Sequence, residues 1–520
     1  MNKNFISFNN QQIEITDEFQ SLYNEIVSNP NKNFFITGQA GTGKTTFLKW
    51  FRDKVSKNKN VAVVAPTGLA AINVQGETIH KFFKLNIAVK DYGYMEELSR
   101  LINTFNINDL KTKINNLDIL IIDEISMVRA DTFKTVEHVL RRKNVQVILF
   151  GDICQLPPIL TSKKDKNLLK ELNISEKEVF LSLYKNDYHK TDFESKFFFS
   201  YYKDKNGYKN FFDKFNIRTL TKNFRQTNDK DYLNILNKLR HGKDYITQTD
   251  LDNLNGRVVK DGMKINSLYT VVTPQKKIAI NINNARLAEI ERPSRTYKAS
   301  YEELTKVKVL KNIDSKNFSL EQDEEPEYTF MLKPKDIDKM KESDRKDDIE
   351  NYFQAPINLT LKVGAKVMIL VNDNNKKYVN GSIGIVTNLF DDKIEIQLQS
   401  NKVVYVEQAV WEKIGYRYNK EKKKLESVVV AQYKQFPLML AWAMTIHKSQ
   451  GQTFSNLFVE LGNGIFENGQ LYVALSRIKS ISGLYLSRNI KFSDIKTDKF
   501  ICDFDKILMK NKIKITENKK

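Results

Sequence analysis

Short apolar runs alternate with helix-compatible stretches along the first third of the chain. Four of these runs, which we predict to be strands, span residues 33–38, 60–68, 117–124 and 144–152. Because nearly every position in them is apolar, they are typical of parallel strands that are buried on both faces. Each run ends in polar or glycine-containing residues, and α/β sheets bind ligands at the carboxyl ends of their strands. The pattern therefore predicts an α/β fold with a ligand site along one edge of a parallel sheet.

The pattern changes further along the chain. Residues 220–290 look like the start of a second α/β unit, with a strand at 271–274. Residues 300–350 contain two stretches that together are more than half charged, which favours a solvated insertion over a specific contact surface. From about 357, short alternating runs joined by Asn-Gly, Asn-Asp and Asp-Asp turns predict a small antiparallel β-barrel. The α/β pattern resumes near 437.

Length and composition exclude several classes of protein. The 520 residues predict roughly three to four domains at ~100–200 residues each. The chain lacks the apolar run of ~18 residues that a membrane span requires, and its first residues lack the apolar region of a signal peptide. Two cysteines, Cys154 and Cys502, are too few for a disulfide framework or a zinc cluster. We therefore expect a cytoplasmic protein, of a bacterial or viral type, in a reducing compartment and without a membrane partner.

Charge points to a polyanionic partner. The chain has 83 Lys and Arg against 63 Asp and Glu, a net charge of +20 and a pI near 9.4. Nucleic acid is the usual partner of so basic a chain. The excess is mostly Lys, however, and the chain is also rich in Asn and Ile, as an AT-biased genome would produce. Charge alone leaves both explanations open.

A phosphate-binding motif follows the first predicted strand. Residues 38–45 read GQAGTGKT, which fits the pattern G-x-x-x-x-G-K-S/T between a strand and a predicted helix. Glycines there let backbone N–H groups surround phosphates, and the helix N-terminus adds a positive dipole. We expect Lys44 to neutralise the β- and γ-phosphates and Thr45 to hold Mg²⁺. The motif predicts ATP and Mg²⁺ as cofactors.

Two further segments carry polar side chains that suit phosphate chemistry. A phosphate-binding loop (P-loop) such as GQAGTGKT needs a carboxylate on a neighbouring strand. Asp123 and Glu124, at the end of the predicted strand LIIDE, can supply it. Asp123 is expected to bind Mg²⁺ and Glu124 to polarise the attacking water, although a helix-capping acid pair is the alternative. Gln155 in FGDICQLPP precedes two prolines that fix the backbone, so its amide is placed to sense the γ-phosphate. Ordinary loop hydrogen bonding is the alternative for Gln155.

Hydrolysis spreads negative charge over the γ-phosphate oxygens, so arginines are also expected at the site. The candidates are Arg225 in LTKNFRQ and Arg477 in YVALSRIK. Each arginine alone would be read as a surface residue. Both become candidates because they belong to the second α/β unit, which would face the first across a nucleotide cleft.

With these residues in place, the chain resembles the petite-integration-frequency (PIF) family of DNA helicases, in superfamily 1B with the RecD-like enzymes. The ordered matches, running from about 15 to 505, are APTGLAAINVQGETIHKFF with motif Ia, IIDEISMVRADTFKTVE with motif II, FGDICQLPPI with motif III, LTKNFRQ with motif IV, MTIHKSQGQTF with motif V and GQLYVALSRIKSISGLYL with motif VI. LKVGAKVMILVNDNNKKYVNGSIGIV is similar to the family's accessory β-barrel. The charged segment 295–350 has no confident counterpart.

The resemblance implies an α/β fold of two RecA-like P-loop domains with an inserted antiparallel β-barrel (2B) and a small helical insertion (1B). The implied division is a first domain over 1–212 with the 1B insertion near 80–112, a second domain over 213–295 and 437–505, a charged insertion over 296–356, the 2B barrel over 357–436 and a basic tail over 506–520.

Roles carry over by position. The resemblance implies catalysis by Lys44, Asp123, Glu124, Gln155, Arg225 and Arg477, with Mg²⁺ on Thr45 and Asp123. Nucleotide contacts would add Gln20, as the reader of adenine, and Gly38, Ala40, Gly41, Thr42, Gly43, Thr46 and Gly451. Contacts to a DNA strand would be made by Pro66, Thr67, Gly68, Asn73, His80, Phe82, Thr273, His447, Lys448 and Ser449. His80 and Phe82 in TIHKFF are the sharper candidates for offering a ring that stacks on a base.

The expected function is that of a monomeric ATP-dependent motor that moves 5′-to-3′ on single-stranded DNA and unwinds forked or partial duplexes, with roles in DNA repair, recombination and telomere maintenance. The polarity comes from the resemblance alone. G-quadruplex DNA as a substrate and dimers on DNA are left open, as are a single-strand translocase and an RNA–DNA hybrid unwinder. A binding scaffold with a degenerate nucleotide site is disfavoured because the catalytic residue types are all present.

Overall fold

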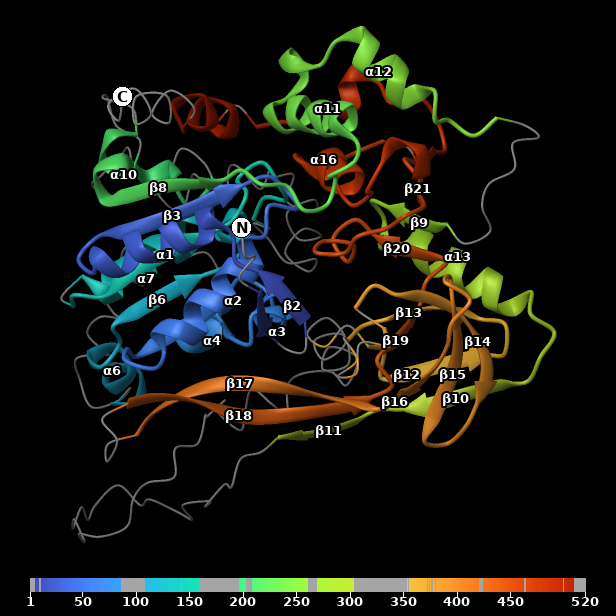
Figure 1. Cartoon of the computed structure of the whole chain (residues 1–520), viewed down its shortest axis with the longest axis horizontal. Coiled ribbons are helices and arrows are strands. Elements are labelled where there is room, and N and C mark those ends of the chain that lie inside the picture. The colour runs from blue at the N-terminus through green and yellow to red at the C-terminus, as the bar shows by residue number, and fades with distance from the viewer. Residues whose placement is uncertain are drawn as a thin grey trace, which may run out of the picture.

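The structure is a computed structural model (Figure 1) that describes residues 5–8, 11–85, 108–158, 196–202, 208–260, 269–303 and 353–508, apart from a turn at 420–423 and single positions within these ranges. Most of the region expected to form the 1B insertion, the greater part of the charged insertion and the end of the basic tail lie outside the described residues.

A six-stranded parallel sheet forms the centre of the first part of the chain. Its strand order is β5-β4-β6-β7-β3-β8, and all its neighbouring pairs are parallel. The strands are β3 (Asn33–Gly38), β4 (Val61–Ala65), β5 (Glu77–Thr78), β6 (Ile119–Ile122), β7 (Gln146–Phe150) and β8 (Phe215–Leu220). The four strands predicted from apolar runs are therefore confirmed.

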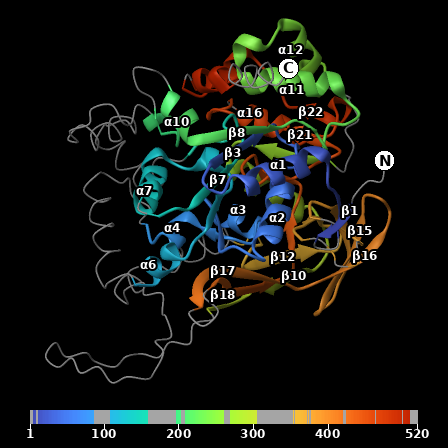
Figure 2. The same cartoon turned by 60° about the vertical axis from the view of Figure 1, so that its left-hand side comes forward.

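Both faces of this sheet are covered, which explains why its strands are apolar at every position. Phe34 and Ile36 face α1 (Asp17–Ser28) and α2 (Lys44–Val55), whereas Phe35 belongs to the core on the opposite face. The helices on that opposite face are α4 (Ile79–Phe82), α6 (Asn108–Asn115), α7 (Ala130–Leu140) and α10 (Lys209–Lys214). Figure 2 shows α4, α6 and α7 together on the side away from α2.

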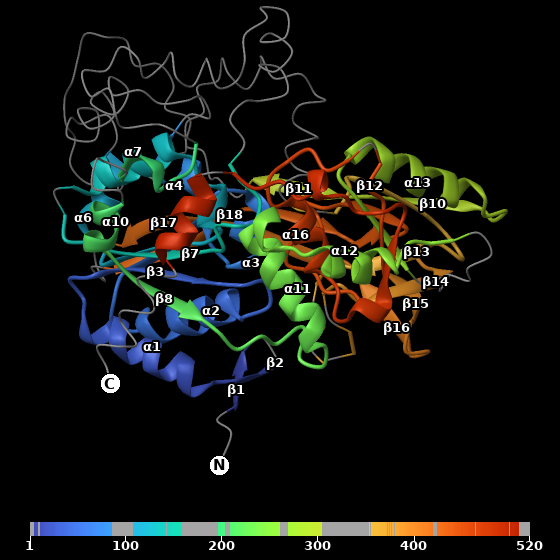
Figure 3. The same ribbon diagram turned by 90° about the horizontal axis from the view of Figure 1, so that it is seen from above.

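A second parallel sheet of four strands follows, with the order β20-β9-β21-β22. The strands are β9 (Thr270–Thr273), β20 (Ala443–Thr445), β21 (Leu457–Val459) and β22 (Leu484–Leu486). One face packs against α11 (Lys230–His241), α12 (Gln248–Asn255) and α16 (Gln470–Leu475), and the other against α13 (Lys276–Ala288). We call each parallel sheet with its helices the first half and the second half; Figure 3 shows them side by side.

The expected β-barrel is instead a set of antiparallel sheets. The larger sheet has the order β16-β15-β14-β13-β19, and two smaller ones pair β10 with β12 and join β11, β18 and β17. The strands are β10 (Ser294–Lys298), β11 (Ser300–Glu303), β12 (Asn358–Lys362), β13 (Lys366–Ile369), β14 (Ile383–Leu389), β15 (Lys393–Leu398), β16 (Val403–Glu407), β17 (Ala409–Asn419), β18 (Lys424–Gln435) and β19 (Leu438–Leu440). In the described part of this region the strands do not close into a barrel.

Two expected boundaries shift. β10 and β11 fall mostly within the segment expected to be a solvated insertion, because residues 294–303 pair with β12 and β18 across the charged segment. At the other end, β19 still belongs to the antiparallel sheet, and the chain enters the second parallel sheet at Ala443. The alternation of apolar and polar residues within one strand does not show which distant strand will pair with it. The predicted boundaries therefore differ from those in the structure.

Several elements join parts of the chain that are distant in sequence. The hairpin β17–β18 extends from the antiparallel region along the first half, where β17 contacts β5, α6 and α3 (Gly68–Asn73) (Figure 1). The helical segment 500–508 follows the second half but packs on the first, with Phe504 in its aromatic core. A short hairpin, β1 (Phe5–Phe8) with β2 (Gln11–Glu14), precedes α1.

None of the helices in the described ranges combines the length and apolar character needed to cross a lipid bilayer.

Candidate nucleotide-binding site

The motif GQAGTGKT forms the turn between β3 and α2, as predicted. Gly38 ends β3, Gly43 caps α2, and Lys44 is the first residue of the helix. Gly38, Gly41 and Gly43 all have positive φ values, of 153°, 87° and 79°. Residues with side chains rarely adopt such values, so the turn requires glycine at these positions. The first N–H groups of α2 are left facing the turn, where an anion can accept from them.

Close packing adds a second reason for two of these glycines. A Cβ at Gly41 would lie 2.9 Å from the Cβ of Arg225, and one at Gly38 would lie 2.7 Å from the carbonyl oxygen of Leu220. The segment after β8 therefore lies directly on the P-loop. Phe224 N–H donates to the Gly41 carbonyl at 2.8 Å, and the Asn223 amide donates to the Ala40 carbonyl at 3.1 Å.

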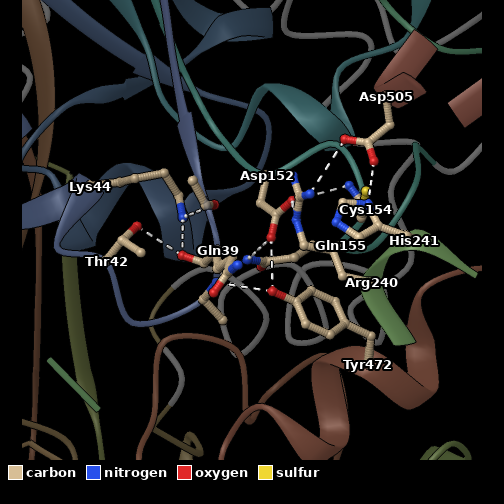
Figure 4. Close-up of polar contacts among 12 residues, drawn as sticks. Gln39, Thr42, Lys44, Asp152, Cys154, Gln155, Arg240, His241, Tyr472 and Asp505 are labelled. Carbon is tan, nitrogen blue, oxygen red and sulfur yellow. Dashed lines mark hydrogen bonds and ion pairs between the residues drawn. The ribbon is translucent and has the colours of Figure 1, made fainter. Parts of the chain in front are cut away.

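Lys44 lies along the loop that precedes it. Its Nζ donates to the carbonyl oxygens of Gly38 at 2.8 Å and Gln39 at 2.9 Å (Figure 4). Thr42 also donates to the Gln39 carbonyl, at 2.9 Å. Burial lowers the pKa of Lys44. An ammonium group in this position is poorly solvated, so a phosphate would be a favourable partner for it.

The carboxylates follow β6, but one strand separates them from the P-loop. The expectation that Asp123 lies on a strand next to β3 is wrong, because β7 lies between β6 and β3. The segment after β6 packs closely against Gly151, which directly follows β7: a Cβ on Gly151 would lie 2.9 Å from Cγ2 of Ile125. Glu124 has a left-handed backbone with φ 49° and ψ 46°, which turns the chain toward the cavity.

Burial gives the carboxylates and the cations of this site unusual pKa values. Burial and then the charge of Glu124 raise the pKa of Asp123 to about 7, and burial raises the pKa of Glu124. Burial lowers the pKa of Arg477, while burial and the neighbouring Arg477 charge lower the pKa of Arg225 to about 9. Such perturbed groups of both signs are typical of functional sites, here one suited to an anion and a metal cation.

The two halves line one cavity of about 590 Å³. From the first half and the segment after β8 it is lined by Phe19, Ala40, Gly41, Gly43, Lys44, Thr45, Thr46, Glu124, Gln155, Phe224 and Arg225, and from the second half by Gln450, Gly451, Thr453, Arg477 and Lys479. The structure thus brings together most of the predicted nucleotide residues. Gly38, Thr42 and Asp123 lie behind this lining.

Both predicted arginines reach the cavity and are held there by the second half. Arg225 Nε donates to the Thr453 hydroxyl and its Nη1 to the Ser476 carbonyl, each at 2.9 Å. Arg477 is only 2% exposed, and its Nε donates to the Val473 carbonyl at 2.9 Å. Both arginines therefore line the same cavity as Lys44.

Gln155 is fixed from both halves. Its Nε2 lies 3.5 Å from the Asp152 carboxylate, and its Oε1 accepts from Gln450 Nε2 at 3.3 Å. The Gln450 side chain also lowers the pKa of Glu124, against the larger effect of burial. The amide predicted to sense the γ-phosphate is thus 5% exposed and held at the interface between the halves.

Two aromatic residues missed by the sequence prediction line the cavity. Phe19 and Phe224 have ring centroids 6.3 Å apart beside Gly43, and Phe224 is 41% exposed. Gln20, predicted to read adenine, is not among the residues that line the cavity and donates to Asn24 at 2.9 Å, while its neighbour Phe19 does line the cavity. An aromatic residue inside LTKNFRQ was the available signal for Phe224, but the folding of this segment onto the P-loop was not visible in sequence.

Some predicted DNA contacts lie in accessible loops and turns. Pro66, Thr67 and Gly68 follow β4, with Thr67 capping α3, and Asn73 at the end of α3 is exposed. His80 on α4 is half-buried. In the second half His447 and Lys448 follow β20 and are half-buried, with His447 Nε2 3.7 Å from Glu467.

Three predicted side-chain contacts to DNA are wrong because the side chains are fully buried. Phe82 lies in the core of the first half, 4.9 Å from Phe83 between ring centroids, and cannot stack on a base there. Ser449 donates to the Ile446 carbonyl at 2.8 Å, inside the second half. Thr273 ends β9 and is also 0% exposed. The sequence of a motif does not show whether an aromatic or hydroxyl side chain within it faces solvent or the core.

The site fits Mg²⁺ bound through phosphates rather than by a cage of protein ligands. Thr45 lines the cavity and Asp123 is 5% exposed, with a pKa that a nearby cation would bring down. Mg²⁺ in nucleotide sites commonly binds one or two carboxylates together with phosphate oxygens and water. Within the described ranges no group of three or more His, Cys, Asp or Glu side chains could hold a metal ion.

Comparison with known proteins agrees with this geometry. The family model for the PIF1-like helicase matches residues 8–186. The ATP-dependent DNA helicase Pif1 of Campylobacter jejuni is 26% identical, over 91% of this chain and 94% of that protein. The structure of Bacteroides sp. Pif1 in complex with ADP-AlF4 has a TM-score of 0.72 and 30% identity, over 96% of this chain and 98% of that one. Bacteroides Pif1 bound to single-stranded DNA has a TM-score of 0.55, with 30% identity over the same shares. The chain therefore belongs to the PIF1-like helicase family.

Proposed function

We propose that this chain is an ATP-driven DNA helicase that moves 5′-to-3′ along single-stranded DNA and separates forked or partial duplexes. The observation that carries the proposal is the cavity shared by both halves, which is lined by Lys44 from the first half, by Arg477 from the second, and by Arg225, which the second half holds. A group that binds between two bodies changes how they sit relative to each other when it arrives or leaves. The Campylobacter jejuni relative is itself named an ATP-dependent DNA helicase. The direction of movement rests on the family resemblance.

Each side chain has a distinct role in this proposal. The P-loop amides and Lys44 bind the phosphates, Glu124 orients and polarises the attacking water, and Gln155 contacts the γ-phosphate. Arg225 and Arg477 stabilise the charge that develops on the γ-phosphate oxygens. Thr45 and Asp123 would hold Mg²⁺, which would supply positive charge to the phosphates. Phe224, with Phe19, offers an aromatic surface for the base.

In this proposal, movement arises because residues held by both halves bind the same phosphate group of ATP. While ATP is bound, Lys44 and the two arginines interact with the same phosphate group, which favours closure of the halves. Once the γ-phosphate is cleaved and leaves, the arginines lose their partner and the halves separate. If the two halves hold the strand in alternation, each cycle advances the protein along it.

The strand is proposed to cross both halves near the ends of β4 and β20. The accessible candidates are Pro66, Thr67, Gly68, Asn73, His80, His447 and Lys448. The structure of Bacteroides Pif1 bound to single-stranded DNA supports a DNA partner. We assign the first and second halves to domains 1A and 2A, the antiparallel region to domain 2B, and the segment between α4 and α6 to domain 1B.

The proposal is tested by strand displacement on duplexes with a single 5′ tail or a single 3′ tail. Purified protein with ATP and Mg²⁺ should separate the 5′-tailed duplex and leave the 3′-tailed one annealed. Lys44→Ala and Arg477→Ala should abolish both displacement and DNA-stimulated ATP hydrolysis, and near-wild-type turnover in either variant would contradict the assignment. An RNA–DNA hybrid and a G-quadruplex with 5′ tails extend the assay to the substrates left open. DNA-stimulated hydrolysis without any displacement would identify a translocase instead.

A further inference from the structure

A buried carboxylate lies beside the nucleotide cavity and has no part in the chemistry described above. Asp152 follows β7 in the first half and is 0% exposed. Its carboxylate accepts from Arg240 Nε and from the Tyr472 hydroxyl, each at 3.0 Å (Figure 4). Arg240 is on α11 and Tyr472 is on α16, so both donors come from the second half. Asp152 is therefore a point where the second half is hydrogen-bonded to the first.

The other side of Arg240 is held by the C-terminal helical segment. Asp505 accepts from Arg240 Nη1 at 3.3 Å and also contacts the His241 ring. This segment is fixed to the first half, because the Phe504 ring stacks on Phe199 with centroids 4.0 Å apart. Arg240, itself 8% exposed, thus lies between two carboxylates that both belong to the body of the first half.

Tyr472 adds a direct connection to the P-loop. Its hydroxyl accepts from the Ala40 N–H at 3.0 Å while it donates to Asp152, and the side chain is 4% exposed. Asp152 is also 3.5 Å from Gln155 Nε2. The Asp152 carboxylate therefore contacts Gln155, which is proposed to sense the γ-phosphate, and two helices of the second half, α16 through Tyr472 and α11 through Arg240.

We propose that Tyr472 and Arg240 are positioning residues that clamp the second half onto Asp152 and thereby hold the P-loop and Gln155 in the arrangement that receives the nucleotide. The inference deepens the proposed function and rests on it. We call the set formed by Asp152, Arg240, Asp505 and Tyr472 the interdomain clamp.

The clamp acts on nucleotide affinity through the closing equilibrium. Its polar contacts are buried, so each one favours the closed arrangement of the halves. When the clamp is weakened, part of the binding free energy of the nucleotide is used to close the halves. Apparent affinity then falls in proportion to the fraction of molecules that are closed. Chemistry in molecules that have closed around the nucleotide is changed less.

The clamp is tested by the affinity of the full chain for a fluorescent, non-hydrolysable ATP analogue with Mg²⁺. Tyr472→Phe removes the hydroxyl that joins Asp152 to the Ala40 N–H. We expect at least about tenfold weaker binding, because a hydrogen bond to a charged group and one from the backbone are both lost. Asp505→Asn is farther from the nucleotide and should also weaken binding by at least about threefold, because Arg240 loses one of its two charged partners. In both variants the DNA-stimulated kcat at saturating ATP should fall by less than the affinity does.

Two matched controls separate positioning from fold stability. Tyr232→Phe removes a buried hydroxyl that donates to the Leu475 carbonyl at 2.8 Å, between the same helices α11 and α16 but within the second half. Asp250→Asn removes a carboxylate that pairs with Lys238 of α11 at 2.9 Å, away from Asp152. We expect both controls to lower the melting temperature and to leave the affinity for the analogue within about twofold of wild type.

Equal affinity in wild type, Tyr472→Phe and Asp505→Asn would overturn the clamp, and so would an equal loss of affinity in the controls. Should Tyr472→Phe fail to fold, Asp505→Asn against Asp250→Asn decides the question. A wild-type protein that does not bind the analogue would contradict the proposed function itself, so the two failures are distinguishable.

Discussion

Gln450 donates a 3.3 Å hydrogen bond from its Nε2 to the Oε1 of Gln155. The contact joins the loop after β7 in the first half to the segment after β20 in the second, across the cavity. The Gln450 side chain also lowers the pKa of Glu124, the residue proposed to orient water. A change in the second half, where part of the DNA strand is proposed to bind, can therefore reach the catalytic carboxylate through one side chain.

We expect Gln450→Ala to reduce DNA-stimulated ATP turnover by about tenfold, because Gln155 loses its hydrogen-bond partner in the second half and Glu124 loses a polar side chain that favours its charged form. Steady-state ATPase assays with and without an oligonucleotide measure this effect. Gln452→Ala is the matched control: its amide is buried two residues away but donates to Asn380 of the antiparallel region at 3.2 Å. Equal stimulation by DNA in Gln450→Ala and Gln452→Ala would contradict the role of Gln450.

Phe224 should set the affinity for the nucleotide base. A stacking contact between an aromatic side chain and a base is worth about 1–3 kcal/mol, so Phe224→Ala should raise the KM for ATP by about fivefold or more while kcat changes little. The KM and kcat of DNA-stimulated hydrolysis measure the effect. Phe492→Ala removes a ring of equal exposure, 42% against 41%, that does not line the cavity. The prediction fails if the two variants show the same KM.

The raised pKa of Asp123 predicts that Mg²⁺ dependence will change near neutral pH. A carboxyl group with a pKa of about 7 is mostly ionised at pH 8 and mostly protonated at pH 6. Since only the ionised form binds a metal ion, more Mg²⁺ should be needed for half-maximal ATPase activity at pH 6 than at pH 8. Mg²⁺ titrations at pH 6, 7 and 8 give the measurement. A half-saturating Mg²⁺ concentration that is the same at all three values would speak against Asp123 as a ligand.

The sequence was sufficient for features that depend on local pattern. Strands β3, β4, β6 and β7 are buried on both faces, so each reads as a continuous apolar run. The P-loop is likewise local: three glycines with positive φ and a helix that starts at Lys44 are all encoded within eight residues. Both arginines were found because a phosphate site requires cations from outside the P-loop.

Features that depend on contacts between distant segments were missed. The position of β7 between β3 and β6 is a matter of sheet order, which apolar runs do not specify. Phe82 and Phe224 illustrate the same limit, since a predicted base-stacking residue is in the core and an unpredicted one lines the cavity. The contact between Tyr472 and Asp152 joins residues 320 positions apart and has no local signature.

The central claim is that ATP hydrolysis in the cavity between the halves is coupled to a DNA strand bound across them. The most direct test is the rate of ATP hydrolysis by the purified protein with and without a single-stranded oligonucleotide, at saturating ATP and Mg²⁺. The proposed coupling predicts a rate that rises at least about tenfold with DNA, and a rate near background in Lys44→Ala under both conditions. Hydrolysis at one unchanged rate, whether or not DNA is present, would contradict it.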